Sequence, residues 1–176
     1  VPKNSQLQVS NSSAIRYLQL FDVDKSIQVF CNRGTSGIDG STSIAIGAAS
    51  ATDLPTILIT GDISFLYDSN ALWNNYIPKN FKIILLNNSG GGIFRILPGH
   101  QETETFNRYF ETSHQLNASH LAKMYGFDYF EANDEATLQQ QYKSFLNQNE
   151  KPSILEIFTP EKENNGILLE FFRGLK

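Results

Sequence analysis

Residues 55–62, Pro-Thr-Ile-Leu-Ile-Thr-Gly-Asp, are a short apolar run that ends in a glycine and an acid. Similar runs lie at 27–31, 82–86 and 153–158, and a shorter one lies at 127–130. Short, β-rich apolar runs that alternate with helix-like segments are typical of a parallel sheet covered by helices. The sequence therefore predicts a doubly wound, mainly parallel α/β domain with helices on both faces of the sheet.

The spacing of apolar side chains predicts helices between these strands. A stripe at i, i+4, i+7 and i+8 is typical of an amphipathic helix, and it is formed by Leu138, Tyr142, Phe145 and Leu146. Small residues at 45–49 predict a helix after the 27–31 strand. The apolar residues within 65–76 predict another helix, with Trp73 in the core.

Charge and composition restrict the possible partners. The chain has 176 residues, and its 14 basic and 18 acidic side chains give a formal net charge of −4. This length suits one domain, and the lack of a basic run argues against nucleic acid or an anionic membrane as partner. No apolar run reaches about 18 residues, so no membrane span is predicted. A single cysteine, Cys31, favours a reducing, cytoplasmic compartment.

Three unusual stretches follow predicted strands, at 32–40, 61–64 and 87–94. In open α/β sheets, ligands bind beyond the carboxyl ends of the strands, so we expect these loops to converge on one edge. Glycine-rich loops expose backbone N–H groups that suit phosphate. The sequence lacks the Walker lysine pattern, the dinucleotide fingerprint and the Gly-x-Ser-x-Gly elbow, which weakens three common interpretations.

Asp62 and Asn88 form a more specific pattern, 26 residues apart and each directly after a strand. Hard divalent cations prefer oxygen ligands and leave several positions to substrate phosphates and water. A carbonyl of the glycine run, best placed at Gly90, would add a third ligand, and Ser64 with loop N–H groups would hold phosphate. Alone, Asp62 fits a helix N-cap and the Asn-Asn pair fits a turn, but their spacing favours a metal-bridged diphosphate.

These residues carry a family resemblance. Gly61-Asp62 followed by Asn87-Asn88 resembles the thiamine diphosphate motif, with Ile63 where the motif commonly has a third-position glycine. The stretches 32–40, 61–70 and 88–94 resemble the C-terminal diphosphate-binding domain of the 2-succinyl-5-enolpyruvyl-6-hydroxy-3-cyclohexene-1-carboxylate synthase family, which acts in menaquinone biosynthesis. The resemblance extends from about Ser12 to the final helix.

The resemblance implies a thiamine-diphosphate-dependent transferase that uses Mg²⁺ or Mn²⁺. It implies metal ligands at Asp62, Asn88 and the Gly90 carbonyl, and at Ile38 an apolar residue that keeps the cofactor bent. The full set of implied cofactor-binding residues is Ser36, Gly37, Ile38, Gly61, Asp62, Ser64, Asn88, Gly90 and Ile93.

The implied reaction decarboxylates 2-oxoglutarate and adds the resulting succinyl-semialdehyde carbanion to isochorismate. Arg16 and Arg33 match two arginines that meet carboxylates, for which guanidinium is the natural bidentate partner. Ser12 lies one helical turn before Arg16 and is expected to share its task. Phe94 matches a position that lines the reaction pocket. A solvated helix face for Arg16 and a structural salt bridge for Arg33 are the competing interpretations.

The family's activating glutamate comes from a separate pyrimidine-binding domain, and no glutamate of this sequence lies in a matching context. We therefore expect no catalytic residue in this chain. The first residue, Val1, also suggests that residues 1–176 are one diphosphate-binding domain, cut from the C-terminal part of a longer enzyme and inactive alone. The expected partners are the N-terminal pyrimidine-binding and middle domains, in a homodimer or a dimer of dimers.

Two alternatives stay open. The first is another thiamine enzyme, such as an acetolactate synthase or an oxoacid decarboxylase, with the same metal residues and a different oxo acid. The second is a non-catalytic nucleotide-binding domain. Arg16 and Arg33 favour a dicarboxylate over pyruvate, and Asp62 with Asn88 argues against the non-catalytic domain.

Overall fold

A six-stranded sheet forms the centre of the computed structural model, which describes residues 1–97 and 99–174. The strand order is β2-β1-β3-β4-β6-β5, and every neighbouring pair is parallel. The strands are β1 (Gln6–Val9), β2 (Gln28–Cys31), β3 (Thr56–Gly61), β4 (Lys82–Asn87), β5 (Asp128–Ala132) and β6 (Ser153–Phe158). The predicted parallel α/β class is confirmed.

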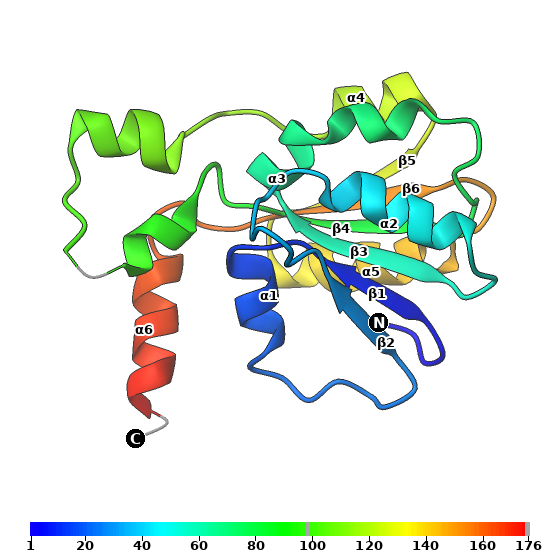
Figure 1. Ribbon diagram of the computed structural model, residues 1–176, viewed down its shortest axis with the longest axis horizontal. Helices are drawn as coiled ribbons and strands as arrows, with labels where there is room; N and C mark the ends of the chain where they lie inside the picture. The colour runs from blue at the N-terminus through cyan, green and yellow to red at the C-terminus, as the bar shows by residue number, and fades with distance from the viewer. Residues whose placement is uncertain (98, 175–176) are drawn as a thin grey trace.

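Helices cover both faces of this sheet (Figure 1). The α-helices are α1 (Ser13–Leu18), α2 (Ser41–Ser50), α3 (Asp62–Tyr67), α4 (Ser119–Tyr125), α5 (Glu135–Asn147) and α6 (Asn164–Gly174). Three short helical turns complete the chain: η1 (Ser69–Trp73), η2 (Gly92–Ile96) and the π-helical η3 (Phe106–Glu111). One buried cluster joins the sheet to α2, α3, η1 and α4, and a second joins its other face to α1 and α5. Among the described residues, no helix is both long and apolar enough to cross a membrane.

Two features differ from the sequence-based expectations. The strand β1 was not predicted, because its Gln-Leu-Gln-Val sequence is only half apolar, yet all four residues are buried between β2 and β3. The helix expected within 65–76 is two pieces, α3 and η1, separated at Asp68. The Asp68 carboxylate turns away to accept hydrogen bonds from the backbone N and Oγ of Ser43 in α2. Trp73 was wrongly placed in the core: it ends η1 and is 66% exposed.

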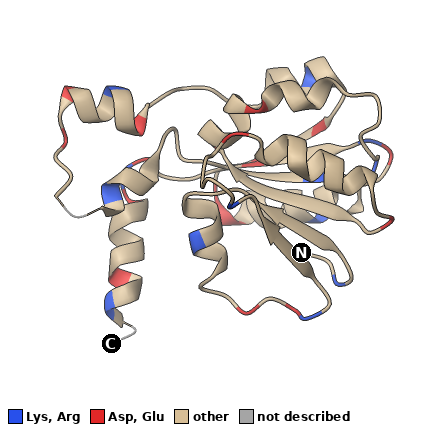
Figure 2. Ribbon diagram, viewed as in Figure 1, with Lys and Arg blue, Asp and Glu red and all other residues tan. Residues whose placement is uncertain are grey.

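The topology creates a crevice at the carboxyl ends of β1 and β3. These strands are neighbours, but α1, which follows β1, packs on one face of the sheet, and α3, which follows β3, packs on the other. Such a switch point is where open α/β sheets bind ligands. Figure 2 shows the Lys and Arg positions of the described residues spread over separate helices and loops.

Candidate functional site

A cavity of about 860 Å³ opens at this switch point. Every site residue predicted from the sequence lines it, although the residues come from four separate segments of loop and adjoining helix. They are Ser12, Arg16, Arg33, Ser36, Gly37, Ile38, Gly61, Asp62, Ser64, Asn88, Gly90, Ile93 and Phe94. Their convergence supports the expectation that the loops share one edge, while their individual roles stay predictions.

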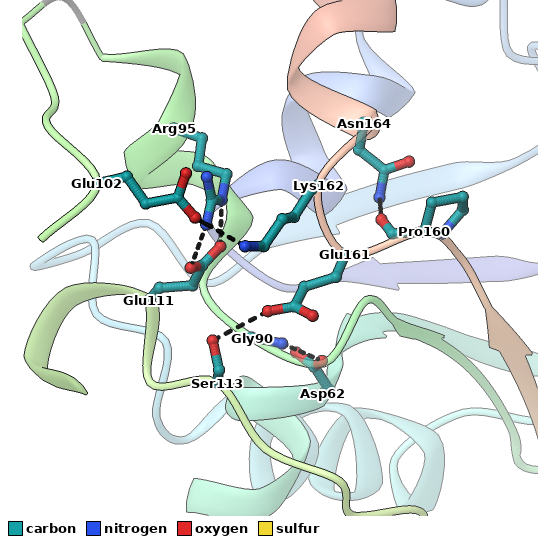
Figure 3. A network of polar contacts seen from close by, with 10 residues as sticks. All are labelled: Asp62, Gly90, Arg95, Glu102, Glu111, Ser113, Pro160, Glu161, Lys162 and Asn164. Atoms are coloured by element: carbon teal, nitrogen blue, oxygen red, sulfur yellow. Dashed lines mark hydrogen bonds and ion pairs between the residues drawn. The ribbon is translucent and has the colours of Figure 1, made fainter. Parts of the chain in front are cut away.

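Asp62 is the buried acid of the site. It begins α3 directly after β3, and it is only 4% exposed. Its Oδ1 accepts a hydrogen bond from the Ile63 N–H (2.7 Å) and its Oδ2 accepts one from the Gly90 N–H (2.9 Å; Figure 3). Burial raises the pKa of the Asp62 carboxyl above its ordinary value, and the backbone N–H groups oppose this shift. The carboxylate therefore ties the end of β3 to the glycine loop after β4.

The donor set around Asp62 fits a hard divalent cation. Within residues 1–97 and 99–174, no Lys or Arg side chain lies within ion-pair distance of this buried carboxylate, whose neighbours are the N–H groups of Ile63 and Gly90 and, at 3.3 Å, Nε2 of His114. Asn88 and Gly90 line the same cavity and offer amide and carbonyl oxygens. The described residues contain no group of three or more His, Cys, Asp or Glu that could hold a metal ion by themselves. Oxygen donors in small number match Mg²⁺ or Mn²⁺.

The glycine loop is shaped by a close backbone contact. The Gly91 N–H donates to the Glu111 carbonyl oxygen at 2.6 Å. A Cβ atom at Gly90 would lie 2.8 Å from that same oxygen, and one at Gly91 would lie 2.9 Å from the Phe110 carbonyl oxygen. Only glycine permits this approach, so the two glycines serve packing against η3 as well as any ligand.

The loop after β2 carries Arg33, Ser36, Gly37 and Ile38, and Asn11 holds it in place. Asn11 follows β1 and is 3% exposed. Its Nδ2 donates to the Asn32 carbonyl oxygen and, at 2.6 Å, to the Gly37 carbonyl oxygen. Its Oδ1 accepts from Nη1 of Arg33 at 3.5 Å. Asn11 was not predicted as a site residue. Its place next to Ser12 indicates a role in the site only once β1 is recognised as the strand before it.

Ser64 connects two loops of the site. Its Oγ donates to the Ile38 carbonyl oxygen at 2.5 Å, which joins the first turn of α3 to the loop after β2. The hydroxyl proton is therefore occupied, and the oxygen lone pairs remain for another donor. Ser64 thus fixes where Ile38 lies.

Arg16 and Arg33 line the cavity from different elements, α1 and the loop after β2. Both are exposed, and neither forms an ion pair with another described residue. The salt-bridge alternative for Arg33 therefore finds no support in the described part of the chain. Two guanidinium groups free to meet carboxylates at one cavity suit a dianionic ligand.

Aromatic side chains form the outer wall of the cavity. Phe94 meets Phe110 edge to face, with ring centroids 5.7 Å apart. Phe110 in turn stacks on Phe106 at 6.2 Å. Phe94 and Phe110 line the cavity and make this part of it apolar, and Phe106 packs against Phe110.

His114 and Glu161 are two further titratable groups near the site. Nε2 of His114 lies 3.3 Å from Oδ2 of Asp62, outside hydrogen-bond geometry, so this buried nitrogen has no hydrogen-bond partner. The three histidines, His100, His114 and His120, lack metal-ligand spacing in the sequence, so the place of His114 beside Asp62 was not predicted. Glu161 lines the cavity, and its Oε1 accepts from Oγ of Ser113 at 3.1 Å. Both contacts join segments distant in sequence.

The doubly wound sheet, the glycine loops and the oxygen donors at its switch point define an α/β domain of the diphosphate-binding class. Residues 11–157 match the family described as thiamine pyrophosphate enzyme, C-terminal TPP binding domain, and the chain belongs to this family.

Relatives with curated names share this chain's sequence almost from end to end. The chain is 67% identical over 175 residues to the 2-succinyl-5-enolpyruvyl-6-hydroxy-3-cyclohexene-1-carboxylate synthase of Flavobacterium johnsoniae, and 70% identical over 175 residues to that of Flavobacterium psychrophilum. Each alignment covers 99% of the chain and 32% of the relative. The synthase of Bacteroides fragilis is 42% identical over 178 residues. The chain thus spans about a third of the length of these relatives.

A solved structure supports the fold. The crystal structure of benzoylformate decarboxylase from Polynucleobacter necessarius superposes with a TM-score of 0.66, covering 92% of this chain and 31% of that chain at 16% identity. Identity this low shows a shared architecture and leaves the substrate to be argued from the site.

Proposed function

We propose that the chain is the diphosphate-binding domain of a thiamine-diphosphate-dependent synthase that decarboxylates 2-oxoglutarate and adds the product to isochorismate. The observation that carries the proposal is the meeting of Asp62, Asn88 and Gly90 with Arg16 and Arg33 in one cavity. The first three residues suit a metal diphosphate, and the two arginines suit dicarboxylates. The names of the Flavobacterium relatives add support.

In this proposal Asp62, Asn88 and the Gly90 carbonyl hold Mg²⁺ or Mn²⁺. Ser36, Ser64 and the N–H groups of the glycine loops contact the diphosphate, and Ile38 supports the bent cofactor. When bound, thiamine diphosphate supplies a nucleophilic thiazolium carbon for reaction with a 2-oxo acid.

The chain's own residues would then bind and orient the substrates. Arg33 and Arg16, with Ser12, take the carboxylates of 2-oxoglutarate and isochorismate. Ile93 and Phe94 line the reaction pocket and reduce its water content, which strengthens the ion pairs inside it. No general acid or base is assigned to this chain, and the activating glutamate is proposed to come from a pyrimidine-binding domain.

The remaining assignments concern the whole enzyme. We propose that residues 1–176 are a single domain in the C-terminal part of a longer chain that also has pyrimidine-binding and middle domains. A homodimer or dimer of dimers, a cytoplasmic location and inactivity of residues 1–176 alone complete the proposal.

A substrate panel with the full-length protein tests this function. The protein, supplied with thiamine diphosphate and Mg²⁺, should consume 2-oxoglutarate with isochorismate and leave pyruvate largely untouched. Turnover of pyruvate alone would favour the acetolactate-synthase or oxoacid-decarboxylase alternative. A calorimetric titration that finds no binding of thiamine diphosphate with Mg²⁺ would leave the non-catalytic nucleotide-binding alternative.

A further inference from the structure

A buried ion pair lies behind the glycine loop. Nε and Nη2 of Arg95 donate to the two carboxylate oxygens of Glu111, the second at 2.5 Å (Figure 3). Arg95 is 5% exposed and Glu111 is 1% exposed. The pair is thus bidentate and almost completely shielded from water. Its two members are 16 residues apart in the sequence.

The pair continues into a network that reaches the surface. Nη2 of Arg95 also contacts Oε1 of Glu102 at 3.3 Å, and this oxygen accepts from Nζ of Lys162 at 2.7 Å. The side chains of Glu102 and Lys162 are 47% and 59% exposed, respectively. The buried and exposed ends of the network can therefore be perturbed separately.

Glu111 contacts the glycine loop through its backbone while its side chain binds Arg95. Its carbonyl oxygen accepts from the Gly91 N–H at 2.6 Å. Arg95 belongs to η2, which begins at Gly92, directly after that loop. The ion pair therefore closes a ring: from Gly91 along the chain to Arg95, across to the Glu111 side chain, and back through the Glu111 carbonyl to Gly91.

The segment held by this ring also contacts Phe94 through Phe110, and Glu161 through Ser113. Residues 100–113 stand away from the sheet, at the upper left of Figure 1. Tyr109, Phe110 and Thr112 from this segment nevertheless line the cavity. The position of this wall therefore depends on its contacts with η2 and with the residues after β6 rather than on packing against the sheet.

We propose that Arg95 and Glu111 are a positioning pair that fixes the Gly90–Gly91 backbone and the Phe110 wall in the arrangement needed for metal-diphosphate binding. This inference rests on the proposed function, because it concerns the loop that would offer the Gly90 carbonyl to the cation. Replacing residues that support metal ligands commonly lowers metal affinity by about 10- to 100-fold.

A double variant separates positioning from stability. In Arg95→Met/Glu111→Leu, apolar side chains replace both charges, which often leaves a protein equally or more stable. The full-length apoprotein, with thiamine diphosphate present, is titrated with Mg²⁺ and followed by calorimetry. We expect a melting temperature near that of the wild type and about a tenfold or larger increase in the Mg²⁺ concentration for half-saturation.

Two single variants complete the experiment. Glu111→Gln keeps the side-chain shape and the backbone carbonyl of residue 111 but loses the charge, and it should also weaken Mg²⁺ binding. This variant tests the inference if the double variant does not fold. Glu102→Gln alters only the exposed end of the network and should bind Mg²⁺ like the wild type. At saturating Mg²⁺, kcat of the double variant should recover most of its wild-type value, which a general loss of folded enzyme would not allow.

The possible failures can be told apart. If the wild type binds no thiamine diphosphate with Mg²⁺, the proposed function is wrong and the inference is lost with it. If the wild type binds and a folded double variant or Glu111→Gln has the same Mg²⁺ half-saturation, the pair has no positioning role. Equal weakening in Glu102→Gln would also overturn the inference, because the effect would then not depend on the buried pair.

Discussion

Replacing Asn11 by alanine should loosen the loop that carries Arg33 and Ser36. Asn11→Ala removes two hydrogen bonds to backbone carbonyl oxygens, those of Asn32 and Gly37, and a longer contact with Arg33. A net hydrogen bond contributes about 1 kcal/mol, and a buried carbonyl left unpaired costs about 1–3 kcal/mol. Because Asn32 and Gly37 are only partly buried, water can reach their carbonyls, and the lower value for each bond applies.

Two such bonds give a loss of about 2 kcal/mol in the local stability of the loop, which is equivalent to about 30-fold in an opening equilibrium. Native-state proteolysis reports such local opening. In the full-length protein, tryptic cleavage after Arg33 should be about 30-fold faster in Asn11→Ala. Cleavage after Lys82 in the central strand β4 should keep its rate.

Asn74→Ala is the matched control. Nδ2 of Asn74 also donates to a backbone carbonyl, that of Ala71, at 2.8 Å, and Asn74 does not line the cavity. Asn74→Ala should leave the rate of tryptic cleavage after Arg33 unchanged. A wild-type rate of cleavage after Arg33 in Asn11→Ala would refute the reasoning, since Asn11 would then not hold the loop.

Three further substitutions test the site and its support in the full-length protein. Asp62→Ala should abolish Mg²⁺-dependent binding of thiamine diphosphate in calorimetry, because the buried carboxylate of the site is lost. The control variant Asp53→Ala, at an exposed position, should bind normally. Unchanged affinity in Asp62→Ala would remove the metal assignment. Arg33→Ala should raise KM for 2-oxoglutarate at least tenfold, about the value of one charged hydrogen bond, and unaltered steady-state kinetics with both substrates would exclude it from the site. Tyr129→Phe removes a 2.7 Å hydrogen bond to buried Glu156. It should lower the free energy of unfolding by about 1.5 kcal/mol without changing Mg²⁺ binding. An unchanged denaturation midpoint would show that this bond contributes no net stability.

The sequence predicted the sheet well where most residues of a strand are large and apolar, and poorly where half of them are polar. β6 was predicted with its observed bounds, Ser153–Phe158, because Ile154, Leu155, Ile157 and Phe158 form a strongly apolar run in spite of the buried Glu156. β1 is equally buried but contains Gln6 and Gln8, and Nε2 of Gln6 has a partner in Thr56 of the adjacent β3. A polar side chain satisfied by a neighbouring strand cannot be recognised before that strand is placed.

Part of the cavity lining followed from one topological rule, whereas the contacts that shape it did not. Loops that leave the carboxyl ends of parallel strands must meet at one edge, so residues as distant as Arg33 and Phe94 could be assigned to one place. Arg16 follows the unpredicted strand β1, and only the family resemblance assigned it to the site. Glu111 and His114 lie in a polar segment without motif or periodicity. Their contacts with Arg95 and Asp62 arise only when residues 100–113 fold back on the glycine loop.

The residues that support the loops act differently from the motif residues. Asn11 holds the carbonyl oxygens of the loop after β2, and Glu111 holds an N–H group of the loop after β4. Both supporting residues are buried and act on backbone groups of the loops, Asn11 through its side-chain amide and Glu111 through its backbone carbonyl oxygen, so the motif residues can stay directed toward the cavity. Because backbone groups are present whatever the loop sequence, this support constrains loop shape without restricting side-chain chemistry. Loss of Asn11 or of the Arg95–Glu111 pair should therefore weaken ligand binding while every motif residue remains in place.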